Sequence, residues 1–488
     1  MIPTTFDNDL RSIQEARTLV AHAKTAANHM AAYTNAQVDA IIKRMVQVAS
    51  EHAERLAKMA VEETGFGNVA DKTFKNQLAS HVLYSKIKDM QTVGVIADDV
   101  ANQITTIAEP MGLLLGIIPS TNPTSTVIFK SIIALKARNG IVFSPHPSAL
   151  KCTLEAATLM REAAVAAGAP QDIIGCVSLP SAKSTSEMMH HPDIAMIIAT
   201  GGPGMVKSAY SSGTPALGVG AGNTPCYIDK SANLEQAVTN IIASKTFDYG
   251  TICASEQAIV VEACHKQAVM QAFEAQGGYF MSADETKRVC ALLFKNGHTM
   301  NAQYVGRSAH LIATAAGISI PPNTRVLIGE QSAVDAHNPL SYEKLTTVLG
   351  FYTARSVEHA YELCNQLLKN GIGHTLSLHS GDKQIVQTFS ALPASRILVN
   401  TGSSQGATGG STELMPSFTL GCGTWGGSSI SENVSPLHLI NLKRVAYGTT
   451  PLSLPTTPTP SMATRSSDID PDSLKELLHA LKEMLQVS

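Results

Sequence analysis

Short, wholly apolar segments alternate with helical segments along the middle of the chain, and this alternation constrains the fold more than any other feature. A strand without polar alternation suits a parallel sheet whose two faces are both covered by helices. Apolar segments lie at residues 113–118, 141–143, 173–177, 194–199 and 226–228, and helical segments cover about residues 124–138 and 148–167. The pattern predicts an α/β fold with a doubly wound sheet, which binds its ligands at the carboxyl ends of its strands.

A second α/β series runs from about residue 230 to residue 415. A chain of 488 residues exceeds what one hydrophobic core usually supports, and no short repeat relates the two series. We therefore expect two separate lobes. In the second series the sequence predicts a helix at residues 356–370 and strands at residues 326–328, 348–352, 376–378 and 397–399.

The segments outside these series have a different character. Thr34 to Gln37 has the form of a capping box, and roughly the first ninety residues are predicted to be mainly helical. Residues 91–111 and 437–447 are rich in β-favouring side chains and predict strands that project from the body. Because such strands would otherwise leave long edges exposed, we expect them to pair at an oligomer interface.

Charge and cysteine usage exclude several classes of function. The formal net charge is −3, with 36 basic and 39 acidic residues dispersed along the chain, so no basic stripe is available for nucleic acid or for a membrane surface. Eight cysteines without paired spacing, and no signal peptide, fit a reducing, cytoplasmic compartment. No apolar run is long enough to span a membrane. His190 and His191 are adjacent and lack the spacing of a zinc site, so we expect no metal.

One cysteine stands out by its surroundings. Residues 247–257 form a turn of small side chains that places Cys253 just ahead of an apolar run. A thiol held at such a turn can act as a nucleophile, whereas most free cysteines are simply small buried hydrophobes. This segment alone leaves both interpretations open.

Two further segments follow predicted strands. Asn122 lies at the carboxyl end of strand 113–118, where its amide can serve a site, although an asparagine before proline is also an ordinary turn residue. Residues 199–204 lie between a strand and a helix, so their backbone can approach a pyrophosphate. Gly218 to Gly222 is similar to a dinucleotide fingerprint, but no helix follows it.

Together these segments resemble the CoA-acylating branch of the aldehyde dehydrogenase superfamily, over residues 7 to 447. Glu343 and the glycine-rich stretches around residues 371–374 and 419–427 support the resemblance. It implies an aldehyde dehydrogenase-like fold of two doubly wound lobes with a small β oligomerisation arm. It also implies that Cys253 is the nucleophile, and that the Asn122 side chain and the Cys253 backbone N–H hold the oxyanion.

The resemblance divides the chain and assigns its cofactor site. It implies an NAD(P)-binding domain at residues 1–90 and 112–229, a catalytic domain at 230–425, an oligomerisation arm at 91–111 and 426–447, a linker at 448–469 and a tail helix at 470–488. Cofactor contacts are expected from Pro119, Ser120, Ser144, Pro145, Thr200, Gly201, Gly202, Gly220 and Glu343. Ser144 stands where the hydrolytic enzymes have a lysine, which leaves NAD against NADP open. His374 is a weaker candidate, as the base that takes the CoA thiol proton, because histidine titrates near neutrality; the favoured alternative is a satisfied structural histidine.

Val219 is the most informative departure from the wider superfamily. The hydrolytic enzymes carry a glutamate at this place, which activates the water that releases an acid. Without that base, a thioester on Cys253 should resist water and wait for another nucleophile. The expected function is reversible oxidation of acetaldehyde or propionaldehyde with NAD+ and CoA to acyl-CoA and NADH, through a thiohemiacetal and a thioester. A hydrolytic dehydrogenase and a catalytically silent scaffold of the same fold are the alternatives.

The resemblance also gives expectations for assembly and location. It implies dimers that associate into tetramers, and the absence of a following alcohol dehydrogenase domain predicts that the long bifunctional form is excluded. Residues 470–488 place leucines on one face of an amphipathic helix, behind a proline-rich linker. This tail resembles the encapsulation peptides that bind shell proteins of bacterial microcompartments in the cytoplasm. The alternative is that the helix packs on its own subunit or on neighbouring copies of itself.

Overall fold

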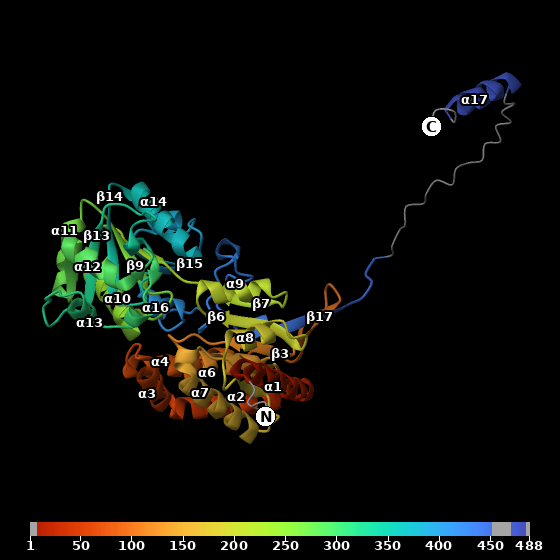
Figure 1. Cartoon of the computed structure of the whole chain (residues 1–488), viewed down its shortest axis with the longest axis horizontal. Helices are drawn as coiled ribbons and strands as arrows, with labels where there is room; N and C mark the ends of the chain where they lie inside the picture. Colours follow the sequence, from red (N-terminus) through yellow and green to blue (C-terminus); the bar gives the residue numbers. More distant parts are fainter. Residues whose placement is uncertain (1–6, 451–469, 485–488) are drawn as a thin grey trace, which may run out of the picture. The chain divides into compact units, whose positions relative to one another are not determined.

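The computed structural model describes residues 7–450 and 470–484. The chain separates into two units, of which the larger comprises residues 1–98 and 105–445 and the smaller comprises residues 99–104 and 446–488. Figure 1 follows the chain through these parts. Among the described residues, no helix is both long enough and apolar enough to cross a membrane.

The amino-terminal region is helical, as predicted. A capping box at Thr34 begins α2: the Thr34 side chain accepts from the backbone N–H of Gln37, and the Gln37 side chain accepts from the backbone N–H of Thr34. A π-helical turn at Leu78–Val82 separates α4 from α5. The helices are α1 (Asn8–Met30), α2 (Asn35–Glu51), α3 (Ala53–Thr64), α4 (Val69–Gln77) and α5 (Leu83–Ile87).

The first lobe contains a parallel sheet of five strands in the order β5-β4-β3-β6-β7. The strand order reverses between β3 and β6, which is where α/β sheets bind ligands. The strands are β3 (Leu113–Ile117), β4 (Gly140–Ser144), β5 (Ile174–Cys176), β6 (Ile194–Thr200) and β7 (Ala216–Val219), connected by α6 (Pro123–Lys136), α7 (Leu150–Ala166), α8 (Ala182–Met189) and α9 (Pro203–Ser211).

The second lobe contains a sheet of seven strands in the order β10-β13-β14-β9-β8-β15-β16, and every pairing in it is parallel. Its strands are β8 (Thr224–Ile228), β9 (Glu256–Glu262), β10 (Gly278–Met281), β13 (Val326–Gln331), β14 (Val348–Ala354), β15 (Gly373–His379) and β16 (Ala394–Val399). Its helices are α10 (Leu234–Thr246), α11 (Lys266–Ala275), α12 (Ala283–Leu293), α13 (Ala309–Ala315), α14 (Val357–Leu368), α15 (Lys383–Phe389) and α16 (Ser403–Ala407); β11 (Phe294–Lys295) and β12 (Thr299–Met300) form a short antiparallel pair.

The strand at residues 226–228 lies in the second sheet, whereas the sequence predicts it in the first. This strand, β8, lies between β9 and β15. Only residues 220–223 connect β7 to β8. A crossover between parallel neighbours needs about a dozen residues or more, so β8 cannot return beside β7, and the chain passes into the second lobe. The sequence also missed β7 itself.

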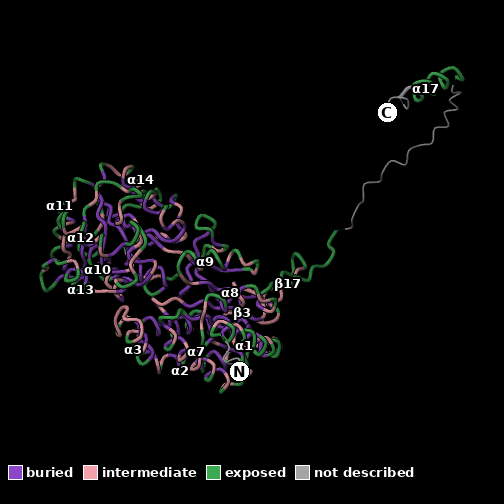
Figure 2. Tube along the Cα trace, in the orientation of Figure 1, coloured by how far each residue is buried: buried purple, intermediate pink, exposed green. Residues whose placement is uncertain are grey.

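Helix α6 is the centre of the first lobe. All its residues, from Pro123 to Lys136, are buried, because the helix is packed among the five-stranded sheet, α2 and α7. Figure 2 shows buried residues in purple through the inside of this lobe and exposed residues in green along the outer sides of its helices. A helix held on all sides fixes the position of its own first turn, and that turn begins at Asn122.

A small sheet in the order β1-β2-β17 corresponds to the predicted projecting strands. Its strands are β1 (Gly94–Asp99), β2 (Ile104–Pro110) and β17 (Ile440–Ala446). The expected strand at 437–447 begins later, because Pro436–Leu439 forms a 3-10 turn. The Lys443 ammonium lies 2.9 Å from the Glu109 carboxylate and links β17 to β2.

The tail helix of the smaller unit, α17 (Pro471–Met484), begins where the sequence predicted. The Asp470 carboxylate accepts a hydrogen bond from the backbone N–H of Asp472. Four leucines on one face of the helix are exposed, namely Leu474, Leu477, Leu478 and Leu481. Residues 451–469 of the predicted linker and the last residues of the predicted helix lie outside the described part of the chain.

Candidate active site

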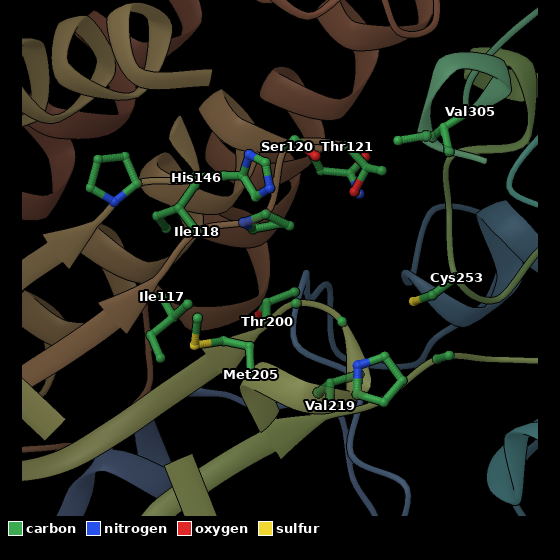
Figure 3. A pocket seen from close by; sticks show the side chains of 18 of the residues that line it. Ile117, Ile118, Ser120, Thr121, His146, Thr200, Met205, Val219, Cys253 and Val305 are labelled. Atoms are coloured by element: carbon green, nitrogen blue, oxygen red, sulfur yellow. The ribbon is translucent and has the colours of Figure 1, made fainter. Parts of the chain in front are cut away.

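A cavity of about 480 Å³ lies at the carboxyl ends of β3 and β6 and extends to the loop before β9. Figure 3 shows side chains from the five-stranded sheet on one side and Cys253 with Val305 on the other. Its lining includes every catalytic and cofactor residue predicted from the sequence except His374, namely Pro119, Ser120, Asn122, Ser144, Pro145, Thr200, Gly201, Gly202, Gly220, Cys253 and Glu343. Residues far apart in the sequence therefore share one site.

The loop that carries Cys253 has an unusual backbone. After α10, Asp248, Tyr249 and Gly250 all have positive φ, at 48°, 51° and 77°. A residue with a side chain in this left-handed region costs roughly 1–2 kcal/mol, so two such residues in succession require outside support. The Asp248 side chain is fully buried and hydrogen-bonded, which supplies it. The resulting turn leads the chain to Cys253, which is half-buried.

Cys253 is neutral in the cavity. Burial first, and then the nearby Glu343 carboxylate, raise the pKa of its thiol to about 12, and the Arg396 guanidinium opposes them. The Nε2 atom of His374 lies 3.2 Å from the Cys253 Sγ. Burial, with Arg396 adding to it, lowers the pKa of His374 well below its ordinary value, so a neutral imidazole faces the thiol.

His374 lies behind the nucleophile. It is fully buried on β15 and does not line the cavity, and its Nδ1 lies 2.8 Å from the Thr375 Oγ1. The sequence made His374 a weaker candidate base because histidine titrates near neutrality, but it did not pair His374 with Cys253, since the two residues are separated by 121 positions. Pairing of β15 and β9 with β8 brings them together.

Asn122 occupies the N-cap position of α6. Its backbone carbonyl accepts from the Thr126 backbone N–H at 3.1 Å. Its side-chain Oδ1 accepts from the Lys75 ammonium at 2.7 Å, and its Nδ2 lies 3.4 Å from the Thr251 carbonyl oxygen. The amide nitrogen therefore faces the loop of Cys253. Lys75 was not predicted from the sequence, because nothing in α4 marks this lysine for a site.

The loop after β7 lies directly against the nucleophile. The backbone N–H of Gly222 donates to the Glu343 carboxylate at 3.0 Å. A Cβ atom on Gly222 would stand 2.0 Å from the Cys253 carbonyl oxygen, so only glycine fits here. Burial raises the pKa of Glu343 to about 7, while its bond to Gly222 and the lysines Lys245 and Lys344 act in the other direction. Val219, at the end of β7, lines the same cavity and is almost fully buried.

The other end of the cavity is open to a phosphate at the start of α9. Pro203, the first residue of α9, has no N–H, and the N–H groups of Met205 and Val206 bond to the Gly202 carbonyl, so the Gly204 N–H is the one in this turn that is available to a phosphate. A Cβ atom on Gly202 or Gly220 would meet no atom within 4 Å, so the backbone is open for close approach. Ser144 is buried, and its hydroxyl lies 2.7 Å from the Thr185 hydroxyl.

In the part of the chain that the structure describes, no group of three or more His, Cys, Asp and Glu residues is placed to hold a metal ion. His190, one of the two adjacent histidines, lies with its Nδ1 2.8 Å from the Ser186 carbonyl oxygen. The Nδ1 of His191 lies 3.9 Å from the Asp193 carboxylate.

Comparisons with known proteins agree with this geometry. Residues 9–284 match the model of the aldehyde dehydrogenase family. The chain is 49% identical, over 89% of its length, to the bifunctional aldehyde-alcohol dehydrogenase of Escherichia coli, and it spans only 50% of that enzyme. The chain therefore spans about half the length of the aldehyde-alcohol dehydrogenases that it matches.

Solved structures are similar over nearly the whole chain. An acetylating aldehyde dehydrogenase from Geobacillus thermoglucosidasius is 49% identical, with a TM-score of 0.91 over 92% of this chain and 100% of that one. A propionaldehyde dehydrogenase from a fucose utilisation microcompartment of Clostridium phytofermentans is 30% identical, with a TM-score of 0.80 over 88% and 97%. One from Rhodopseudomonas palustris, solved with bound CoA and an acylated cysteine, is 27% identical, with a TM-score of 0.79 over 88% and 97%.

Proposed function

The chain belongs to the aldehyde dehydrogenase family, and from that premise we propose that it is a CoA-acylating aldehyde dehydrogenase. The proposed reaction oxidises acetaldehyde or propionaldehyde, with NAD+ and CoA, to acyl-CoA and NADH. The observation that carries the proposal is the content of one cavity: a cysteine, an amide facing its loop, and an apolar Val219 where hydrolytic relatives have a glutamate.

Cys253 begins the proposed reaction by adding its sulfur to the aldehyde carbon. The thiol proton has to leave, and the nearest acceptor is the neutral Nε2 of His374, at 3.2 Å. The oxygen of the resulting thiohemiacetal develops negative charge, which the Asn122 Nδ2–H and the Cys253 backbone N–H stabilise. Preorganised donors of this kind are each worth on the order of 3 kcal/mol in the transition state.

Oxidation then converts the thiohemiacetal on Cys253 into a thioester. NAD+ supplies the hydride acceptor when it is bound; Glu343 and the glycines of the loop after β7 would hold its nicotinamide end, and Gly202 with the start of α9 its pyrophosphate. Val219 provides no base to activate water, so the thioester persists until its acyl group passes to the CoA thiol. Cys253 is released as a thiol. Because one thioester replaces another, the proposed reaction is reversible.

His374 is the proposed acceptor of the CoA thiol proton as well. The CoA sulfur must reach a carbonyl carbon bonded to the Cys253 Sγ, and His374 lies against that same sulfur. After the oxidation, the imidazolium releases the proton taken from Cys253 to solvent, and this proton is the net H+ of the reaction. The neutral imidazole can then take the CoA thiol proton and return it to Cys253. This role rests on the one distance between Nε2 and Sγ, and it extends the weaker prediction made from the sequence.

NAD is the proposed cofactor in preference to NADP. A 2′-phosphate requires a cationic partner, and the described residues that line the cavity include no lysine or arginine. Ser144 stands at the place of the lysine that hydrolytic relatives use there, and its hydroxyl is engaged by Thr185. Initial rates with NAD+ and with NADP+ at equal concentrations test the preference, and faster turnover with NADP+ would contradict it.

The function is tested by following NADH formation from acetaldehyde and propionaldehyde with and without CoA. We expect strict CoA dependence, and acyl-CoA as the product identified by mass spectrometry. Turnover without CoA that yields a carboxylic acid would select the hydrolytic alternative. No turnover across a panel of aldehydes would select the silent scaffold.

Homo-oligomerisation through the small sheet is part of the proposal. All residues of β17 after Ile440 are exposed in the single chain, and Leu442 and Val445 are among them. An exposed strand at the edge of a sheet readily pairs with another chain. Light scattering at micromolar protein is expected to give a dimer or a tetramer, and a monomer would contradict this part.

Location inside a bacterial microcompartment in the cytoplasm is the last part of the proposal. Helix α17 exposes four leucines on one face, which requires a partner, and a relative from a microcompartment shares the fold. We therefore propose that α17 binds a shell protein. A fluorescent protein fused to residues 468–488 should form puncta only in cells that make shells, and diffuse fluorescence in those cells would refute the targeting role.

A further inference from the structure

A buried charge cluster lies beside the candidate active site and has no place in the steps above. Lys72 and Lys75, both on α4, form ion pairs with the carboxylate of Asp248. All three side chains are almost completely buried, with exposed fractions of 3%, 1% and 0%. Asp248 belongs to the left-handed turn of the Cys253 loop, so the cluster connects α4 to the nucleophile segment.

Lys75 is the member of the cluster that reaches the site. Its ammonium donates to the Asn122 Oδ1 at 2.7 Å, to the Thr251 hydroxyl at 2.8 Å and to the Asp248 carboxylate. An ammonium has three N–H donors and no acceptor, so these bonds use it completely. Only the oxygen of the Asn122 amide can face it, and the nitrogen must point the other way.

The opposite end of the amide is held less firmly. The Asn122 Nδ2 lies 3.1 Å from the Thr121 hydroxyl and 3.4 Å from the Thr251 carbonyl oxygen. The second of these contacts is long for a hydrogen bond, so its N–H can turn to a stronger acceptor that forms in the cavity. Without Lys75, the amide is free to flip and to present its oxygen to an oxyanion, which would repel it.

We propose that Lys75 is a positioning residue, which fixes the orientation of the Asn122 amide so that its N–H donors face the oxyanion on Cys253. The inference rests on the proposed function for the identity of that oxyanion. The same lysine ties the amide to the nucleophile loop through Thr251 and Asp248, so that donor and nucleophile keep their separation. Lys75 acts through Asn122 and does not touch the substrate.

Asp248 supports this role by keeping the lysine charged. Burial lowers the pKa of Lys75 to about 8, Lys72 adds to the lowering, and the Asp248 carboxylate opposes both. Asp248 is itself fixed, because its Oδ1 accepts from the Asn68 backbone N–H at 2.9 Å and its own N–H donates to Asp71 at 2.7 Å. Asp248, which these hydrogen bonds fix in place, therefore holds the charged Lys75 side chain against the Asn122 amide.

Lys72 offers a matched control within the cluster. It donates to the same Asp248 oxygen at 2.8 Å and to the Thr121 carbonyl oxygen at 2.8 Å, but not to the Asn122 side chain. The variants Lys75→Met and Lys72→Met thus each remove one buried cation from one carboxylate. Only Lys75→Met releases the amide.

The test compares kcat and KM of the two variants in the CoA-dependent assay with the full chain. Removal of one oxyanion donor costs about a hundredfold to a thousandfold in kcat, so we expect Lys75→Met to lose about a hundredfold with little change in the KM for the aldehyde. Lys72→Met should lose no more than about threefold. Equal losses in both variants would overturn the proposal.

A double-mutant cycle separates positioning from general structural support. If Lys75 acts through Asn122, then in an Asn122→Ala background Lys75→Met should lower kcat no further than Lys72→Met does. A multiplicative, about hundredfold further loss in that background would also overturn the proposal. Thermal unfolding is measured for each variant, and Lys75→Gln, whose amide allows both orientations of Asn122, replaces Lys75→Met if that protein does not fold.

Failure of the proposed function is distinguishable from failure of this inference. Absence of CoA-dependent NADH formation by the unaltered chain would refute the proposed function. CoA-dependent turnover by the unaltered chain, combined with equal effects of the two lysine substitutions, would refute only the role of Lys75.

Discussion

Gly222→Ala adds a single methyl group directly against the nucleophile. A methyl group on Gly222 would stand 2.0 Å from the Cys253 carbonyl oxygen, 3.0 Å from the Cys253 carbonyl carbon and 3.2 Å from the His374 ring. Cβ atoms in proteins almost never approach another atom within about 3 Å, so the loop and the nucleophile must separate by about 1 Å. The Gly222 N–H also donates to Glu343, so the displacement reaches the carboxylate that is proposed to hold the nicotinamide end of NAD+.

A misplacement of about 1 Å at reacting groups costs about a hundredfold in rate, and overpacking typically costs about 1–3 kcal/mol of folding free energy. We therefore expect Gly222→Ala to lower kcat about a hundredfold while the protein still unfolds cooperatively. The assay is NADH formation with saturating aldehyde and CoA, together with thermal unfolding.

Gly448→Ala is the matched control. Gly448 does not line the cavity, its φ is not positive, and an added Cβ atom there would meet nothing within 4 Å. Alanine fits this position without strain, so unchanged activity and equal or slightly higher stability are expected. Gly222→Ala with activity within about threefold of the unaltered chain would refute the steric reasoning.

Three further predictions address the nucleophile. Cys253→Ala should abolish turnover and leave NAD binding intact, whereas Cys264→Ala, which changes an exposed cysteine, should be nearly silent; more than about a hundredth of the activity in Cys253→Ala would rule out covalent catalysis there. Val219→Glu should let some of the acyl-enzyme hydrolyse. Hydrolysis should increase as the pH rises, because burial favours the protonated carboxyl and only the ionised form can activate water. If no acid product forms at any pH, this position alone does not select the nucleophile. Because the pKa of Cys253 is raised to about 12, its alkylation by iodoacetamide without cofactor should accelerate about tenfold per pH unit between about pH 7 and pH 9, and a plateau below pH 9 would contradict the raised pKa.

Local features of the fold and of the site were predictable because they are encoded within a few residues. The capping box at Thr34, the strand that ends before Asn122 and the small-residue turn around Cys253 each depend on near neighbours, and all three are present in the structure. The glycine-rich loop after β7 could also be singled out from the sequence. Its actual constraint, a carbonyl oxygen 2.0 Å from where a Cβ would stand, could not.

The strand at residues 226–228 shows how far pattern alone extends. Its apolar composition predicted a buried parallel strand correctly, and β8 is one. Its sheet was predicted wrongly, because a strand that is buried on both faces has the same composition in either lobe. The short connection from β7 places β8 in the second sheet, and the sequence pattern did not predict β7.

The sequence by itself determined the two α/β series, the nucleophile candidate Cys253 and the candidate amide Asn122, and through the resemblance it assigned to the apolar Val219 the proposed choice between acyl transfer and hydrolysis. Only the tertiary structure decided which residues hold these groups in position. Lys75 and Asp248 are separated by 173 positions, and His374 and Cys253 by 121, yet each pair is in direct contact. The physical reason is that a lysine or histidine has the same local preferences whether it is solvated or buried. Its partner is chosen by the packing of helix and sheet, which brings distant charges together where water is excluded.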